Sequence, residues 1–249
     1  TRPELAVIMA YAKLDLFSSL ISSEAPDDSA FEGLLAAYFP KPLEKFSRAR
    51  ARHRLRREII ATRLSNRLVN MTGASFGVQK RDAEGIDIGK LAEAFEAAYA
   101  AFHFDDLFAR INALDGEAPA AAQILMTVET AANLRMLASA FVSEATMVRT
   151  GSVARVIERY RTAIAEIRGA LPAALSPLVL GRVESRAEKY RAAGAPNDIA
   201  GDVALVRALA SARETVEITE QTGWPLQSAL FVQHQFGEQA GEARALVDD

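Results

Sequence analysis

The 249-residue sequence contains no cysteine, one tryptophan and three histidines. The lack of cysteine excludes disulfide frameworks, thiolate zinc sites and a cysteine nucleophile. No apolar run approaches the roughly 18 to 20 residues that a membrane helix needs, and nothing resembles a secretory or transit signal. The expectation is therefore a cytoplasmic chain with no membrane. The sequence opens Thr1-Arg2-Pro3 without a methionine, which suggests a piece cut from something longer.

Nucleotide-binding motifs are also lacking. No G-x-G-x-x-G occurs, and Gly89-Lys90-Leu91 has neither the upstream glycine nor the Ser or Thr of a P-loop. Gly73-Ala74-Ser75-Phe76-Gly77 fits the G-x-S-x-G of hydrolases, but that site needs a strand before the serine, and residues 57–70 are predicted to be helical. A helix end at a glycine turn explains the pattern better.

Histidine gives equally little support for a catalytic or metal site. His103 lies beside Asp105 and Asp106, which could contribute to a metal site. A helix terminus in which one of these aspartates caps the next helix is the commoner arrangement. We therefore predict no catalytic, cofactor-binding or metal-binding residue in this chain.

Helical periodicity dominates what is present. Half of the residues are apolar, and alternating runs typical of strands are absent. Caps, prolines and glycines mark about nine to eleven helices in an irregular all-α bundle. The expected helices cover residues 3–20, 29–38, 55–70, 87–104, 119–148, 152–171, 178–193, 196–221 (as one helix or interrupted near Ala210) and 225–240, with a break at Pro172 and Pro177. Phe95, Tyr99 and Phe102 are expected to be core residues.

Thr150-Gly151-Ser152 is the best candidate for a domain boundary. It would divide the chain into an N-terminal helical lobe, residues 1–150, and a C-terminal lobe, residues 151–249, unless both form one domain. In the second lobe, Gln233-His234-Gln235 interrupts an apolar helix pattern, which indicates an exposed surface or an interface.

Positive charge is concentrated in one stretch. Residues 41–67 carry ten cations and two anions, a net +8, so the rest of the chain carries −11. Such asymmetry fits either nucleic-acid binding or pairing with the acidic remainder, within the chain or across an interface. Pairing is favoured for two reasons. Arginines at every second position spread around a helix instead of forming one face, and Phe46 is the one aromatic residue within 41–67 that could stack on a base. The candidate interface residues are Arg48, Arg50, Arg52, Arg54, Arg56, Arg57, Arg63 and Arg67.

Several longer segments carry a family resemblance. They are Arg2-Pro3-Glu4-Leu5-Ala6-Val7 with Ala10-Tyr11-Ala12-Lys13, Tyr38-Phe39-Pro40-Lys41-Pro42-Leu43, and above all the run from His53 to Leu64, followed by Asn66 and Val69-Asn70. Weaker likeness continues through residues 113–115, 118–120 and 220–223. Together they make the chain similar to the C-terminal helical region of the large bacterial NAD-specific glutamate dehydrogenases.

This resemblance implies a non-catalytic helical domain for assembly, stability or regulation. In that family the nicotinamide-binding fold and the catalytic lysine and aspartate lie upstream, so none of their residues is carried over. The parent enzyme would convert L-glutamate, NAD and water to 2-oxoglutarate, ammonium and NADH. The basic stretch would then dock on the catalytic domain of the same polypeptide or on another subunit of a homo-oligomer. The alternative is a free-standing helical adaptor or nucleic-acid-binding protein that uses residues 48–67.

Overall fold

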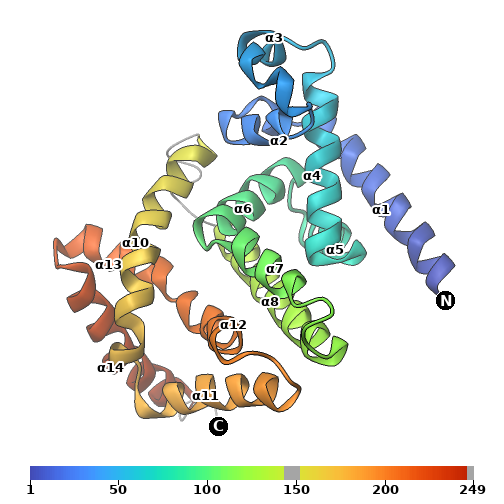
Figure 1. Cartoon of the computed structure of the whole chain (residues 1–249). Helices are drawn as coiled ribbons and strands as arrows, with labels where there is room; N and C mark the ends of the chain where they lie inside the picture. The colour runs from blue at the N-terminus through green and yellow to red at the C-terminus, as the bar shows by residue number, and fades with distance from the viewer. Residues whose placement is uncertain (143–151, 246–249) are drawn as a thin grey trace. The chain divides into compact units, whose positions relative to one another are not determined.

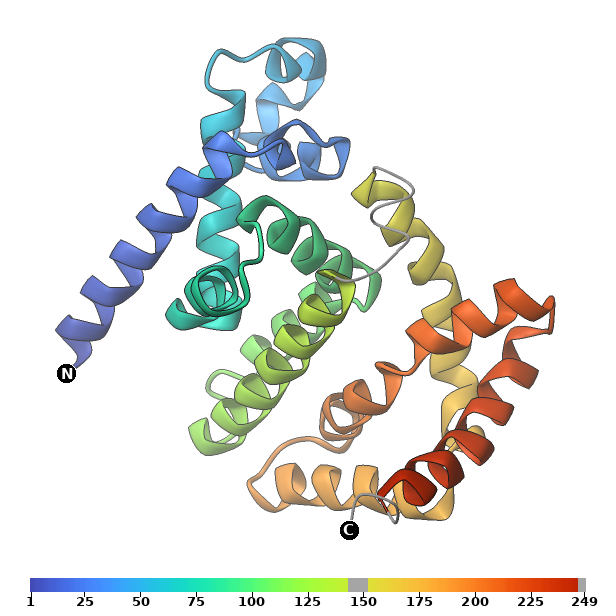
Figure 2. The ribbon, with the colours of Figure 1, turned by 180° about the vertical axis from the view of Figure 1, so that it is seen from behind.

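The computed structural model of the chain consists of helices joined by turns (Figures 1 and 2). It describes residues 1–142 and 152–245. These residues form thirteen α-helices and three 3₁₀ helices without a strand, which confirms the all-α prediction. The helices outnumber the nine to eleven that were expected because α3, α5 and α7 lie outside the expected ranges.

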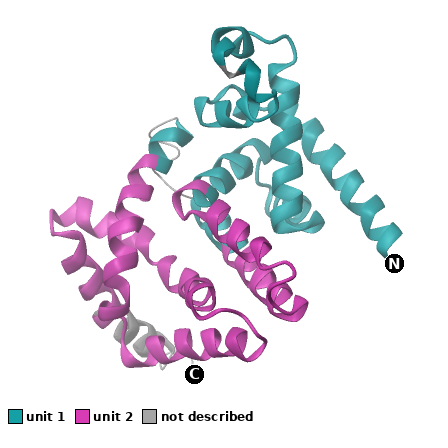
Figure 3. Ribbon diagram, in the orientation of Figure 1, with its two compact units in different colours: residues 1–99, 134–157 teal, residues 100–133, 158–249 magenta. Residues whose placement is uncertain are grey.

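The chain forms two compact units (Figure 3). Unit 1 contains residues 1–99 and 134–157, and unit 2 contains residues 100–133 and 158–249. Both units are therefore built from two separate stretches of the sequence. The boundary predicted at residues 150–152 falls next to residues 143–151, which lie outside the described residues, and it stays a prediction.

Unit 1 is organised around α4, which contacts α1, α2 and α5. The helix forms where the sequence places an apolar stripe at three- and four-residue spacing, and Ile60, Leu64 and Leu68 in this stripe are fully buried. The α-helices of this unit are α1 (Arg2–Ser22), α2 (Glu32–Ala36), α3 (Ser47–Ala51), α4 (Arg56–Thr72), α5 (Ala74–Glu84), most of α6 (Ile88–Ala101), the end of α8 (Ala120–Val142) and the start of α10 (Val153–Ala174).

Short 3₁₀ helices connect the N-terminal helices of unit 1. They are η1 (Ala25–Asp27), η2 (Ser29–Phe31) and η3 (Lys41–Phe46). Asp28 joins two helix N-termini: its Oδ1 accepts from the Ala30 amide at 2.7 Å, and its Oδ2 accepts from the Val153 amide at 3.1 Å. Val153 is the first residue of α10. Asp28 therefore caps η2, and its second hydrogen bond ties two distant segments of unit 1 together.

Unit 2 contains the remaining helices. They are α7 (Phe104–Ala113), part of α8 (Ala120–Val142), most of α10 (Val153–Ala174), α11 (Pro177–Ala192), α12 (Asn197–Leu209), α13 (Ala212–Thr222) and α14 (Leu226–Ala245). α12 packs against α11 and α7, and α13 packs against α14. Gly194, between α11 and α12, has a φ of 97°, and a Cβ there would lie 2.8 Å from the ring of Pro119. This turn therefore requires glycine on two grounds.

Two helix breaks expected from the sequence have different outcomes in the structure. The interruption expected near Ala210 is confirmed, since α12 ends at Leu209 and α13 begins at Ala212. The break expected at Pro172 and Pro177 is present directly before Pro177, but α10 continues through Pro172 and ends at Ala174. A proline in the last turn removes a single helical hydrogen bond, which the helix tolerates so close to its end. The chain turns by 108° before α11 begins at Pro177.

α1 corrects one sequence expectation. An 18-residue window of this helix has a mean hydropathy of 1.5, so by length and composition it is apolar enough to cross a membrane. Counting uninterrupted apolar residues missed it, because a few charged residues are spaced along the helix. α10 and α11 pass the same test only if they are treated as one bent span.

Candidate docking interface

The arginines of the basic stretch divide into two groups, and the first group binds within unit 1. Arg56 donates through Nη1 to the Pro26 carbonyl at 2.7 Å and lies beside the carboxylates of Asp27 and Glu32, at 3.5 and 3.4 Å. Arg57 donates to the carbonyls of Ile21 and Ser23 at 3.0 and 2.8 Å and also pairs with Asp27. The start of α4 therefore binds the C-terminal end of α1, where carbonyls lack helical partners.

Two further arginines on α4 complete this inner group. Arg67 donates from Nη1 to both carboxylate oxygens of Glu96 at 2.8 Å, and its guanidinium lies 4.9 Å from the centre of the Tyr99 ring. The Glu96 side chain is only 10% exposed. Arg63 donates to the Ala37 carbonyl at 3.0 Å and lies over the Tyr38 ring. The prediction that the basic stretch pairs with acidic residues of the same chain is therefore confirmed for Arg56, Arg57 and Arg67.

The second group is the outer basic segment, residues 41–55, which contains η3 and α3. Its six cations and one glutamate give a net charge of +5. Arg48, Arg52 and Arg54 are exposed, and no hydrogen bond or ion pair of their side chains is found in the described part of the chain. Arg50 differs, because it donates to the Leu43 carbonyl at 3.0 Å. The eight predicted interface residues are therefore not one surface.

Exposed apolar side chains accompany these cations. Phe46 is 51% exposed with Lys45 against its ring, and Leu43 and Leu55 are also exposed. Positive charge combined with apolar area is typical of protein interfaces, where arginine and aromatic residues are enriched. The outer basic segment is the part of the predicted interface that remains available to a partner.

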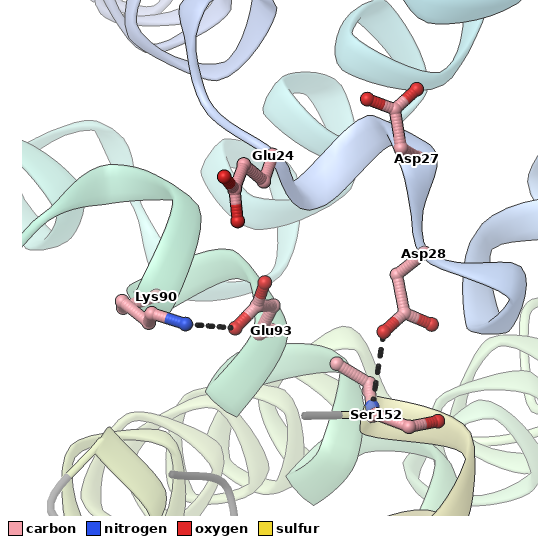
Figure 4. Close-up of a pocket in the computed structure, with 7 residues that line it drawn as sticks. Glu24, Asp27, Asp28, Lys90, Glu93 and Ser152 are labelled. Carbon is pink, nitrogen blue, oxygen red and sulfur yellow. Dashed lines mark hydrogen bonds and ion pairs between the residues drawn. The ribbon is translucent and has the colours of Figure 1, made fainter. Parts of the chain in front are cut away.

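An acidic pocket of about 430 Å³ lies elsewhere in unit 1 (Figure 4). Glu24, Asp27, Asp28 and Glu93 line it together with Lys90. Asp27 pairs with arginines of α4, and Asp28 caps two helices, so these carboxylates have structural partners. Within the described residues no group of three acidic, histidine or cysteine side chains is arranged to hold a metal ion.

Glu93 is the carboxyl of this pocket with a displaced pKa. Burial raises the pKa of Glu93, and the carboxylates of Asp28 and Asp87 raise it further, while Lys90, whose Nζ lies 3.3 Å from it, opposes the change. The folded state therefore binds this proton more readily than the unfolded state. The ionised form costs stability at neutral pH, and the cost disappears as the pH falls through the raised pKa toward 4.5.

We expect Glu93→Gln to unfold at a higher urea concentration than the unsubstituted chain at pH 7, because the amide removes a poorly solvated charge. The difference should shrink as the pH falls through the raised pKa toward 4.5 and vanish below it. Urea titrations at several pH values would measure this. Glu117→Gln, at an exposed position, is the matched control. It should change neither the urea concentration at which the chain unfolds nor the dependence of that concentration on pH. A destabilised Glu93→Gln at pH 7 would contradict the argument.

The glycine–serine motif at residues 73–77 and the histidine–aspartate group at residues 103–106 lie at helix ends in the structure. Gly73, with a φ of 92°, ends α4 and precedes α5, and Ser75 is exposed in the first turn of α5. A helix precedes the serine where a hydrolase needs a strand. His103 adopts the left-handed conformation at the N-terminus of α7. Asp105 and Asp106 lie within the first turn of α7 and neither caps it, so the expected cap is wrong; negative charge is favourable there.

The sequence left open whether the polar run Gln233-His234-Gln235 is an exposed surface or an interface, and the structure places it where α14 packs against α13. Gln233 donates from Nε2 to the Ser211 carbonyl at 3.1 Å and to Glu214 at 2.7 Å, and it accepts from Thr215. His234 Nε2 lies 3.0 Å from Ser211 Oγ. That hydroxyl also donates to the Ala208 carbonyl at 2.7 Å, so Ser211 and His234 link the end of α12 to α14. The polar run is thus an internal interface.

Comparison with known proteins gives a consistent result over nearly the whole chain. Residues 1–244 match the family described as "Glutamate dehydrogenase, C-terminal". The chain is 30% identical to the NAD-specific glutamate dehydrogenase of Halomonas elongata over 224 residues, which are 89% of this chain but 14% of that protein. It is 38% identical to the enzyme of the same name from Pseudomonas aeruginosa over 130 residues, and 34% identical to that from Mycobacterium tuberculosis over 131. These two matches cover 52% of this chain and 8% of each relative.

Proposed function

The chain belongs to the family of glutamate dehydrogenase C-terminal regions, and from this premise we propose that it is the helical, non-catalytic C-terminal part of a large NAD-specific glutamate dehydrogenase. The observation that carries the proposal is the match over residues 1–244 to a C-terminal family, with 14% of the Halomonas elongata relative covered. The parent polypeptide would oxidise L-glutamate with NAD and water to 2-oxoglutarate, ammonium and NADH, as a cytoplasmic enzyme of amino-acid catabolism.

NAD would be the cofactor of the parent, bound by residues outside this chain. The role of the chain itself would be to stabilise, assemble or regulate the parent enzyme, a homo-oligomer. Its contacts would be with the catalytic domain of the same polypeptide or with a neighbouring subunit. The outer basic segment supports this role, because it combines exposed positive charge with exposed apolar side chains.

The alternative of a nucleic-acid-binding protein is not supported. It needs the arginines of residues 48–67 to face a polyanion together, but Arg56, Arg57 and Arg67 pair with carboxylates of unit 1 and Arg63 binds a carbonyl. The family match gives no support to it either.

Two measurements test the proposal. First, a parent polypeptide cut to remove the residues equivalent to this chain should lose thermal stability, oligomer size or turnover. Second, the 249-residue chain should show no NAD-dependent oxidation of glutamate. A truncated parent that equals the intact enzyme in all three properties would refute the proposed role, and turnover by the chain alone would refute its non-catalytic character.

For the outer basic segment, we expect Arg48→Ala/Arg52→Ala/Arg54→Ala to lower by about 4 °C the midpoint of the thermal transition in which this C-terminal region unfolds within the parent enzyme. The expected cause is weaker docking, so added salt should produce a similar loss in the unsubstituted enzyme. The midpoint of the 249-residue chain should not change, because the three side chains are exposed and make no ion pair in the described residues. Differential scanning fluorimetry of both proteins measures these values.

The control is a second triple variant with the same loss of charge, Arg182→Ala/Lys189→Ala/Arg207→Ala. These side chains are also exposed, and the structure shows no hydrogen bond or ion pair for them among the described residues. Equal effects of the two triple variants on the parent would mean that net charge matters and the outer basic segment does not.

A further inference from the structure

α1 is apolar on two opposite sides, and only one of them is packed. Its inner side, Ala12, Leu16 and Leu20, is buried against α4 and α5. On the outer side, Val7 is 54% exposed, Tyr11 70% and Leu14 62%. These three residues recur at four- and three-residue spacing and so form a stripe along the helix. A helix that is apolar all round is normally covered on all sides.

Two hollows extend this apolar surface on both flanks of α1. One, of about 660 Å³, lies toward α5 and is lined by Leu5, Ile8 and Tyr11 of α1 with Val78 opposite. The other lies toward α4 and includes Leu14 and Phe17. The α1 face is defined here as Leu5, Val7, Ile8, Tyr11 and Leu14, whose exposed area together is on the order of 600 Å². That is at the upper end of what a monomer leaves uncovered, which indicates a contact site.

A membrane does not fit this surface well. Asp15 of α1 pairs with Arg81 of α5 at 2.9 Å, and the inner stripe is packed against the body of unit 1. A spanning helix would have to give up these contacts and carry Lys13 and Asp15 into lipid. The charges of α1 (Arg2, Glu4, Lys13 and Asp15) sum to zero, so they offer no attraction to anionic headgroups.

We infer that the α1 face is a docking surface for an apolar segment of the parent glutamate dehydrogenase polypeptide outside this chain. The inference rests on the proposed function. It is supported by length, because the match leaves 86% of the Halomonas elongata relative outside the region similar to this chain. A segment on the same polypeptide is present at a high effective concentration, so it competes favourably with a second copy for an exposed apolar face.

The test compares one cysteine variant in two contexts. Tyr11→Cys is placed in the 249-residue chain and in the parent polypeptide, and its reaction with a maleimide is followed at the peptide level by mass spectrometry. The chain has no cysteine of its own. We expect the thiol to react freely in the chain and at least about tenfold more slowly in the parent, because the docked segment must open first.

A second variant, Tyr11→Glu/Leu14→Glu, gives an independent measurement. It should leave the thermal midpoint of the 249-residue chain unchanged, because both side chains are exposed there, and lower by about 5 °C the midpoint at which the same region unfolds within the parent. Arg182→Glu, at an exposed position within α11, changes the net charge by the same −2 and is the control for added negative charge; it should lower the midpoint of neither protein.

Three results would overturn the inference. Equal labelling in the chain and the parent would show that nothing covers the α1 face. Slow labelling already in the chain, with a dimer mass by light scattering, would identify a second copy as the occupant. Flotation of the chain with phosphatidylcholine or phosphatidylglycerol vesicles would identify a membrane. None of these results would alter the truncation experiment, so the inference can fail while the proposed function stands.

Discussion

Replacing Arg67 with alanine should lower the free energy of unfolding by about 3 kcal/mol. Glu96 is nine-tenths buried, and Arg67 supplies two hydrogen bonds to its carboxylate at 2.8 Å. Without the guanidinium, a buried negative charge keeps its desolvation penalty and loses most of its compensation. Loss of the contact with the Tyr99 ring adds to the effect. Urea denaturation followed by far-ultraviolet circular dichroism measures the change.

A double-mutant cycle separates the ion pair from simple loss of packing. Glu96→Gln alone leaves Arg67 without its full charge partner, and the double variant Arg67→Ala/Glu96→Gln should be less damaged than the two single effects predict. Arg54→Ala, which removes an exposed guanidinium, should change the unfolding free energy by less than about 0.5 kcal/mol. Equal losses for Arg67→Ala and Arg54→Ala would contradict the division of the basic stretch into inner and outer groups.

The second large effect is expected at Phe95, where alanine should lower the unfolding free energy by about 4 kcal/mol. The ring is fully buried in α6 and stacks on Tyr99 with centroids 5.7 Å apart. Truncation removes the transfer free energy of the ring and leaves a cavity that the surrounding helices fill only in part. Phe95→Leu should cost less than half as much, because most of the volume is kept. Phe231→Ala, at a half-exposed ring, is the control and should cost about 1 kcal/mol or less. Similar losses at Phe95 and Phe231 would contradict the assignment of Phe95 to the core.

The helices were predictable from the sequence where periodicity and punctuation agreed. The apolar stripe from Ile59 to Val69 followed by Gly73 predicts α4, and the structure places its end at Thr72. α5 was missed because its apolar positions are few and it begins directly after Gly73, which reads as the start of a loop. Pro172 misled for a related reason, since a proline near a helix end and a proline that ends a helix look alike in sequence.

The division of the basic stretch was not predictable from the sequence. The alternation of arginines does not show which of them bind carboxylates or carbonyls. The partners of Arg57 and Arg67, for example, lie about 30 residues away in the sequence. A helical projection of residues 56–67 places four arginines on one helix, but it does not show which neighbouring residues they bind. The role of Gln233 and His234 was hidden in the same way, since it depends on α13 packing against α14.

The alternation of the two units along the chain has a consequence for synthesis on the ribosome. Unit 1 begins at the first residue but needs residues 134–157 for completion, so its N-terminal helices emerge long before their last partners. At about 5 to 20 residues per second, that delay lasts several seconds. During it the buried faces of α4 and α6 have no complete core. The nascent chain is therefore expected to depend on chaperones at this stage, and a premature stop anywhere between residues 100 and 157 would leave unit 1 incomplete.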